Sequence, residues 1–217
     1  MMMIEMEGLW YPHLHHHHLD AIIRGEDIPS FFMTNFIEVY DDALSSNQCK
    51  TIIDYFESSN EKERGVVGQG DVVRVDLSKK DSTDLVLLFS YENNITKLIH
   101  DSLYDHSQQY IKKYKDLYKI TPWAPQNDFN LQRYLPGQGY KSIHCEHNAK
   151  EDTTVLAWMF YLNTVEDGGT KFTSYDLTTD CIEGRLVIWP AYWTHCHVGI
   201  TSKTKTKYIA TGWTCFI

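Results

Sequence analysis

The chain has 217 residues, of which 42% are hydrophobic and 23% are charged, and its formal net charge is −9. This length and composition indicate a soluble globular protein with one sizeable core. The acidic balance argues against a general nucleic-acid binder, because binding phosphates needs a basic face. No run of about 18 apolar residues is present, so the sequence predicts neither a membrane span nor a secretory signal peptide.

The five cysteines form an odd set without CxxC pairs, which predicts reduced thiols and a cytoplasmic protein rather than a disulfide framework. The tract His15–His18 resembles a fragment of an affinity tag, although the surrounding segment could be natural. Four adjacent histidines cannot all face one ion, so the tract is not interpreted as a metal site. We expect residues 1–30 to be a flexible N-terminal extension and residues 31–217 to form a single domain.

The first half of the domain is predicted to alternate strands and helices. Residues 31–40 alternate in polarity and favour a strand, and Ser45 follows as the cap of a helix, with Gln48 completing a capping box. A short strand is expected over residues 71–77, after a glycine-rich approach. Apolar residues then recur at helical spacing over residues 94–118, which predicts the longest helix.

The second half is rich in short apolar runs separated by glycine, proline or aspartate. Five strands are expected there: residues 129–134, 153–162, 171–174, 185–189 and 207–217. Such a succession predicts a mainly β fold with flanking helices (α+β), in which a sandwich or jelly roll covers about residues 125–217. The run 155–162 is apolar at every position and should be a central strand covered on both faces.

Strand alternation places Asn130, Gln132 and Tyr134 on one polar face, which hints at a site. Shortly afterwards His144 and Glu146 stand two residues apart, so in an extended chain both point to the same side and can converge on one ion. Alternatively, they are two solvated polar residues at a loop edge.

A second histidine would complete a facial triad of two histidines and one carboxylate, the set that holds non-haem iron. His197 is a candidate for this place and stands ten positions before Lys207. His195 has the same strand parity and remains the alternative.

The order of these motifs resembles the prolyl 4-hydroxylase-like family of Fe(II)- and 2-oxoglutarate-dependent oxygenases. The elements that carry the resemblance are Tyr134, Pro136-Gly137, His144, Glu146, Tyr161-Leu162-Asn163, Gly168-Gly169-Thr170, Phe172, Gly184 with Leu186 to Trp189, His197 and Lys207. The chain departs from the pattern in two places. Glu146 replaces the usual aspartate, and the Gly-Gly segment is about one residue short.

The resemblance implies a double-stranded β-helix (jelly-roll) core packed on N-terminal helices. In that family a basic residue follows the distal histidine by about ten positions, which favours His197 over His195. The resemblance therefore implies iron bound by His144, Glu146 and His197, with no catalytic side chain beyond these ligands. It further implies 2-oxoglutarate bound by Lys207, Tyr134 and Tyr161, O2 as co-substrate, and a role for ascorbate. Lys207 should share its strand face with Ile209, Thr211 and Trp213, where an unpaired ammonium is costly unless it meets an anion.

The same resemblance suggests hydroxylation of a C–H bond, with a proline in a peptide or protein as substrate and succinate and CO2 as co-products. Tyr140 and Arg74 are the expected substrate contacts. A small molecule or a nucleobase stays open as substrate, although the net charge of −9 disfavours the nucleobase. Two other classes, a non-catalytic cupin-like metal-binding module and a zinc hydrolase, would have no need for Lys207.

Overall fold

A computed structural model describes residues 34–69, 72–120, 122–147 and 153–217 of the chain. Residues 36–217 form one compact unit. The His15–His18 tract and the extension expected over residues 1–30 lie outside the described residues, and the predicted domain boundary stays a prediction. No helix in the described part is both long enough and apolar enough to cross a membrane.

The described elements are strands β1 (Glu38–Tyr40), β2 (Glu63–Arg64), β3 (Val67–Gln69), β4 (Val72–Arg74), β5 (Lys80–Asp81), β6 (Thr83–Leu88), β7 (Trp123–Pro125), β8 (Asp128–Tyr134), β9 (Gly139–Tyr140), β10 (Thr154–Tyr161), β11 (Val165–Phe172), β12 (Leu177–Cys181), β13 (Leu186–Pro190), β14 (His197–Gly199) and β15 (Lys207–Phe216), the α-helices α2 (Ser46–Ser58) and α3 (Asn94–Lys113), and the 3₁₀ turns η1 (Lys115–Lys119) and η2 (Trp193–His195). The larger sheet has the order β1-β13-β10-β15-β8-β6-β2, with β7 beside β15, and the smaller has the order β12-β11-β14. All strand pairs in both sheets are antiparallel.

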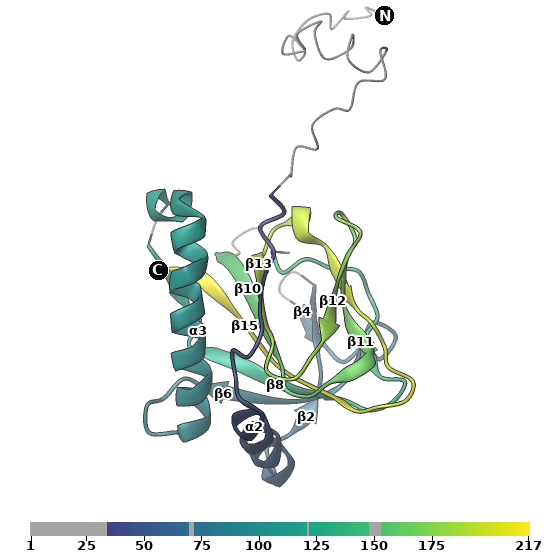
Figure 1. The fold of residues 1–217 in the computed structure, drawn as a ribbon. Helices are drawn as coiled ribbons and strands as arrows, with labels where there is room; N and C mark the ends of the chain where they lie inside the picture. The colour runs from purple at the N-terminus through teal and green to yellow at the C-terminus, as the bar shows by residue number, and fades with distance from the viewer. Residues whose placement is uncertain (1–33, 70–71, 121, 148–152) are drawn as a thin grey trace, which may run out of the picture. The chain divides into compact units, whose positions relative to one another are not determined.

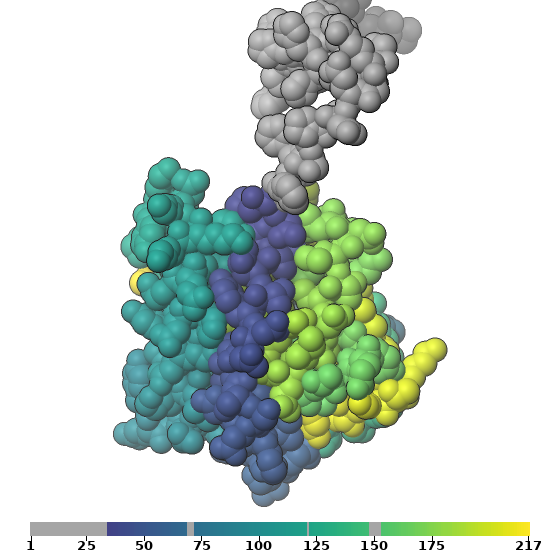
Figure 2. All heavy atoms as spheres, viewed as in Figure 1, coloured from purple at the N-terminus to yellow at the C-terminus, as the bar shows by residue number. Residues whose placement is uncertain are grey.

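Helices and the small sheet lie on opposite sides of the large sheet. Figure 1 shows α2 and α3 on one side and β11 and β12 on the other. In the space-filling view, the purple segment that begins this unit forms a band between the teal helical layer and the green strands (Figure 2). The predicted class, a mainly β jelly roll packed on helices near the N-terminus, is therefore confirmed.

Strand β10 is the centre of the large sheet, where it pairs with β13 on one edge and β15 on the other. Every one of its residues is buried. Trp158 and Phe160 pack in the core beneath the helices, whereas Met159 and Tyr161 pack in the core between the sheets. The expectation that this run is covered on both faces is confirmed.

The helix predictions hold at their starts and differ at one end. Ser45 caps α2 in a capping box: its hydroxyl accepts from the backbone N–H of Gln48, and the side-chain oxygen of Gln48 accepts from the backbone N–H of Ser45. Helix α3 begins at Asn94 but ends at Lys113 rather than near Tyr118. The apolar residues beyond that point continue in the 3₁₀ turn η1, whose tighter winding the 3.6-residue spacing could not reveal.

The predicted strands are present, but several boundaries moved. The strand expected over residues 71–77 is only β4, which forms a hairpin with β3. β11 begins at Val165 and therefore includes the Gly-Gly segment, where the register with β12 shifts before Thr170. Gly169 has φ +108°, and a Cβ there would lie 2.5 Å from the carbonyl oxygen of Thr179, so this position favours glycine.

Candidate active site

Two chain segments far apart in the sequence bring the predicted metal ligands together. His144 and His197 form an antiparallel bridge in which each backbone N–H donates to the other residue's carbonyl, at 3.0 and 2.8 Å. His197 opens β14, which pairs with β11 and so belongs to the small sheet. Glu146 is anchored separately, since its backbone N–H donates to the carbonyl of Ala191.

The ligand atoms converge on one point. The carboxylate oxygen Oε1 of Glu146 lies 3.2 Å from Nε2 of His197 and 3.8 Å from Nε2 of His144. One ligand atom from each of the three residues falls within 4.8 Å of the others, and this trio is the one such group found among the described residues. Nδ1 of His144 lies 2.9 Å from the carbonyl of Ser142, and Nδ1 of His197 lies 3.0 Å from that of His195. These contacts leave both Nε2 atoms for a metal.

The protonation states also suit a divalent cation. Burial, reinforced by the neighbouring His197, lowers the pKa of His144 to about 4, against the opposing effect of Glu146. Burial raises the pKa of Glu146, but hydrogen bonding and charge from His197, with smaller contributions from His144 and Trp213, lower it to about 2. A neutral imidazole and an ionised carboxylate are the forms that bind metal. The residues therefore fit the iron that the family resemblance implies.

Lys207 lies in the same cavity with its ammonium group buried. The residue is 4% exposed, and its Nζ donates to the carbonyl of Ile200 at 3.1 Å. Among the described residues, no carboxylate forms an ion pair with it. Burial lowers the pKa of Lys207. A buried cation on a cavity wall without a carboxylate partner fits the anionic cosubstrate.

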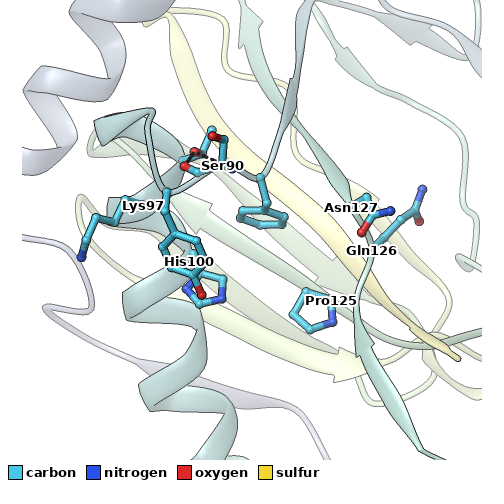
Figure 3. A pocket seen from close by; sticks show the side chains of 9 residues that line it. Ser90, Lys97, His100, Pro125, Gln126 and Asn127 are labelled. Atoms are coloured by element: carbon cyan, nitrogen blue, oxygen red, sulfur yellow. Dashed lines mark hydrogen bonds between the residues drawn. The ribbon is translucent and has the colours of Figure 1, made fainter.

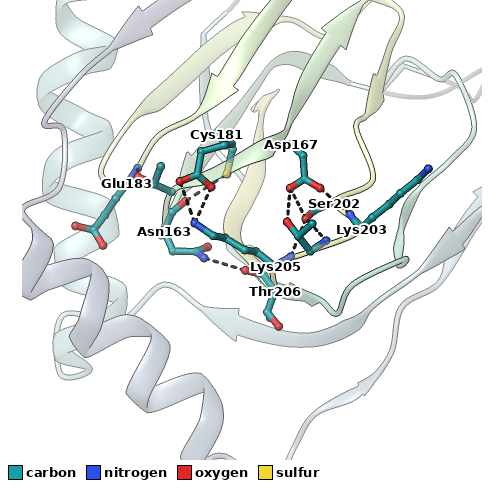
Figure 4. Close-up of polar contacts among 11 residues, drawn as sticks. Asn163, Asp167, Cys181, Glu183, Ser202, Lys203, Lys205 and Thr206 are labelled. Carbon is teal, nitrogen blue, oxygen red and sulfur yellow. Dashed lines mark hydrogen bonds and ion pairs between the residues drawn. The ribbon is translucent and has the colours of Figure 1, made fainter.

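The loop before Lys207 is held by one acidic side chain. Asp167 accepts hydrogen bonds from the hydroxyl of Ser202 at 2.6 Å, the backbone N–H of Lys203 at 2.9 Å and the hydroxyl of Thr204 at 3.0 Å. Figure 4 shows this carboxylate turned toward Ser202 and Lys203. These hydrogen bonds, chiefly that from Ser202, lower the pKa of Asp167 to about 2. The start of β15 is thereby fixed relative to β11.

The cavity that contains these groups has a volume of about 330 Å³ and lies between the two sheets. Its lining comprises Val66, Gly68, Val73, Lys80, Asp84, Asn130, Gln132, Tyr134, Tyr140, His144, Cys145, Glu146, Met159, Thr170, Trp189, His197, Gly199, Lys207, Ile209, Thr211 and Trp213. The polar face predicted on β8 and the face of β15 that carries Lys207 both line it.

The two tyrosines assigned to the cosubstrate are placed differently. Tyr134 lines the cavity, and its hydroxyl donates to Oε1 of Gln132 at 2.7 Å. Tyr161 is fully buried outside the lining, with its hydroxyl bonded to that of Thr170 at 2.8 Å. Because Thr170 does line the cavity, Tyr161 can influence a ligand there through this hydroxyl.

The remaining predicted residues surround the cavity or lie outside it. Tyr140 stacks on the ring of His144, with centroids 3.7 Å apart and planes 16° apart. Arg74 is exposed and pairs with Asp76, whereas its neighbour Val73 lines the cavity. His195, the alternative third ligand, lies in η2 with its ring 5.1 Å from that of Tyr175, outside the cavity lining.

Sequence reasoning missed a buried polar network on the cavity wall. The carboxylate of Asp84 accepts from Nζ of Lys80 at 2.6 Å, from Nε2 of Gln132 at 3.2 Å and from the hydroxyl of Ser82 at 2.7 Å. Since the amide nitrogen of Gln132 faces Asp84, its oxygen faces Tyr134. Residues 80–84 show no recognisable motif, so only the antiparallel pairing of β6 with β8 could have revealed the network.

A second cavity, of about 200 Å³, lies where β6 ends and α3 begins (Figure 3). Its lining includes Lys97 and His100 from the helix, and Gln126 and Asn127 from the turn between β7 and β8. It contains none of the predicted site residues and no metal-ligand trio within the described part of the chain. The chemistry therefore belongs to the cavity between the sheets.

Comparisons with known proteins agree with this site. The sequence profile of the 2OG-Fe(II) oxygenase superfamily matches residues 129–215, which include all three metal-ligand candidates and Lys207. No curated protein matches the chain. Together, the matched profile and the metal-ligand trio support a dioxygenase that uses Fe(II), 2-oxoglutarate and O2.

Within that class, its fold is the one found in prolyl 4-hydroxylases, which confirms the resemblance seen in the sequence. A viral collagen prolyl hydroxylase from Paramecium Bursaria Chlorella virus-1, in complex with 2-oxoglutarate, has a TM-score of 0.61 and 19% identity, over 84% of this chain and 96% of that one. A Pseudomonas putida prolyl-4-hydroxylase has a TM-score of 0.62 and 13% identity, over 85% and 94%. A Trichoplax adhaerens prolyl hydroxylase, in complex with a hypoxia inducible factor peptide fragment, has a TM-score of 0.63 and 14% identity, over 84% of each chain.

Proposed function

We propose that this dioxygenase hydroxylates a proline residue in a peptide or protein. In this proposal His144, Glu146 and His197 hold Fe(II), and Lys207 binds the distal carboxylate of 2-oxoglutarate. The observation that carries it is a buried ammonium, without a carboxylate partner among the described residues, in the same cavity as a trio of metal ligands.

When bound, iron and 2-oxoglutarate supply an oxidation in which O2 converts a substrate C–H to C–OH and 2-oxoglutarate to succinate and CO2. The side chains of the protein bind and orient the metal and the cosubstrate. His144 is kept neutral and Glu146 ionised, while the stacked ring of Tyr140 restricts movement of the His144 imidazole. The hydroxyl oxygen of Thr170 accepts from Tyr161, which leaves its O–H to donate a hydrogen bond to the cosubstrate. No side chain is required as a general base.

A polypeptide substrate is favoured by the apolar side of the cavity mouth. Val66 directly precedes β3, and Val73 lies in β4. Both line the cavity while remaining 43% and 66% exposed, respectively. Such partly exposed valines can cover an extended peptide segment and exclude water from the iron. Tyr140 lines the same cavity and would face the substrate there, and Arg74 would meet parts of the peptide outside the cavity. The prolyl substrates named for the structurally similar enzymes support the same choice.

The test uses the full chain loaded with Fe(II) without oxygen, mixed with 2-oxoglutarate and exposed to air with a panel of proline peptides. The expected result is succinate formation, and a peptide that gains the mass of one oxygen atom at a proline. Lys207→Ala and His197→Ala should both remove the succinate. Succinate without peptide hydroxylation, or equal stimulation by a peptide with alanine in place of proline, would reject proline as the substrate.

A further inference from the structure

The two carboxylate oxygens of Glu146 have different partners. Oε1 faces the two histidines, at 3.2 Å from Nε2 of His197 and 3.8 Å from Nε2 of His144. Oε2 accepts a hydrogen bond from the indole Nε1 of Trp213 at 2.7 Å. The carboxylate is thus divided between a metal-facing oxygen and an oxygen held by the protein.

Glutamate needs such a restraint more than aspartate does. Its extra methylene adds a rotatable bond, and ordering a glutamate side chain costs about 1.5–2 kcal/mol of rotamer freedom. The additional length also lets the carboxylate turn and offer both oxygens to one ion. An indole N–H is a donor only and makes a single hydrogen bond, so it can hold one oxygen and leave the other free.

Trp213 is well placed to act as a fixed donor. It lies within β15, where it pairs with Ala157 of the fully buried β10, and its carbonyl accepts from the backbone N–H of Gln126 at 2.9 Å. It shares its strand face with Lys207. One rigid strand therefore carries both the indole and the proposed cosubstrate anchor.

We infer that Trp213 is a positioning residue that compensates for the glutamate in this metal site. By holding Oε2, it would leave Oε1 as the one oxygen of Glu146 available to a bound metal. The inference rests on the proposed function, in which Glu146 is a metal ligand. It predicts that the effect of Trp213 depends on the length of the side chain at position 146.

The cavity offers a matched control. Trp189 also lines it, with its ring 5.0 Å from that of His197, yet its buried indole N–H has no hydrogen-bond partner among the described residues. Replacing Trp189 with phenylalanine removes a comparable indole without removing a hydrogen bond to Glu146. The two tryptophans thus separate loss of the hydrogen bond from loss of ring volume.

The experiment measures Mn²⁺ affinity of the full chain by electron paramagnetic resonance without 2-oxoglutarate, so that no turnover enters the readout. Trp213→Phe should weaken binding about tenfold, the lower limit for loss of a group that orients a metal ligand. Trp189→Phe should bind as the native chain does. In a Glu146→Asp background, Trp213→Phe should change the affinity little, because the shorter side chain has one rotatable bond fewer for the indole to restrain. Thermal unfolding of each variant verifies that it is folded.

The outcomes separate the inference from the function on which it rests. If Glu146→Ala binds Mn²⁺ as tightly as the native chain, Glu146 is not a ligand and the proposed metal site fails. If Glu146→Ala loses the metal but Trp213→Phe binds normally, the metal site stands and the inference is overturned. Equal weakening by Trp213→Phe and Trp189→Phe, or the same weakening in the aspartate background, also overturns it, since ring volume would then explain the effect.

Discussion

The two faces of the large sheet are built from the same strands but have different contents. On the helical side, β8 contributes Phe129 and Leu131, and β10 contributes Trp158 and Phe160, all packed in a closed apolar core. On the other side, the alternate positions of β8 are Asn130, Gln132 and Tyr134, which surround a cavity. Moving by one residue along a strand therefore changes the environment from core to site.

The difference follows from the period of two in a strand and from what covers each face. Helices α2 and α3 bring apolar stripes that fill the first face, including Ile52 and Ile99, whose side chains are fully buried. The small sheet closes the second face and leaves space for ligands. The lesson is that one set of strands separates stability from chemistry, so substitutions on the two faces should fail in different ways.

The largest contrast is expected on the cavity face at His197. Replacing this residue with alanine should lower succinate formation at least about a hundredfold, because loss of a ligand should exceed the 10- to 100-fold effect of its supporting partners. The free energy of unfolding of the metal-free protein should stay close to that of the native chain. Succinate release and urea unfolding measure the two quantities. An equally large loss of stability would mean that the cavity face also supports the fold.

The reverse result is expected for Phe160, which is completely buried beneath the helices. Phe160→Ala should reduce the free energy of unfolding by about 3–5 kcal/mol, the usual cost of such a truncation in a core. Mn²⁺ affinity per folded molecule should be retained. Urea unfolding and metal titration below the transition test this, with Phe160→Leu as a milder control. A folded Phe160→Ala protein without metal affinity would contradict the separation of the two faces.

The features that were predictable from the sequence are those that depend on local spacing. The His144 and Glu146 pair follows from strand parity, and the capping box at Ser45 follows from a three-residue interval. The apolar run 155–162, which forms most of β10, identified the centre of the sheet. The choice of His197 over His195 depended on its distance to Lys207, and the structure brings His197 to the ligand cluster.

The features that were not predictable depend on partners brought together by the tertiary fold. Asp84 and Gln132 bond across β6 and β8, 48 residues apart in the sequence. Strand β12 carries few apolar residues, so periodicity gave no signal for it. The direction of the Tyr161 hydroxyl depends on how the two sheets pack, because its partners Thr170 and Thr179 belong to the small sheet.

A substitution at Lys207 is expected to have a smaller effect, which weakens cosubstrate binding but raises the stability of the ligand-free protein. Lys207→Met should weaken 2-oxoglutarate binding at least about 30-fold, since losing one partner of a buried charge pair costs 2 kcal/mol or more. The same change should raise the stability of the ligand-free protein by roughly 1 kcal/mol, because a buried ammonium without a carboxylate partner is removed. Anaerobic calorimetry with Fe(II) and 2-oxoglutarate, together with urea unfolding, tests both.

The pH dependence of Lys207 gives an independent check. Burial lowers its pKa from the ordinary value of 10.5. At a pH between the lowered pKa of the folded chain and the ordinary pKa of the unfolded chain, the unfolded chain binds a proton that the folded chain does not. The stability of the native protein therefore rises with pH in this range. Lys207→Met lacks this titrating group, so its stability does not rise in the same way. Its stability advantage over the native protein should therefore shrink as the pH approaches 10.5. A pH-independent difference between the two proteins would contradict the lowered pKa of Lys207.

The smallest effect is expected at the loop that leads into Lys207. Asp167→Asn replaces a carboxylate that accepts three hydrogen bonds with an amide, whose nitrogen can only donate. The loop should therefore loosen. The KM for 2-oxoglutarate should rise a few-fold, and kcat should be retained. Lys205→Ala is the control, because it removes only the exposed ion pair with Glu166 and should leave the KM unchanged. Steady-state succinate assays distinguish the two variants.

The effect of Asp167 on the loop should not depend on pH near neutrality. Since the pKa of Asp167 is lowered to about 2, the stability that its carboxylate gives the loop should be constant near neutral pH and disappear only as the pH falls toward that value. A KM effect of Asp167→Asn that vanishes between pH 6 and 8 would mean that another group holds the loop.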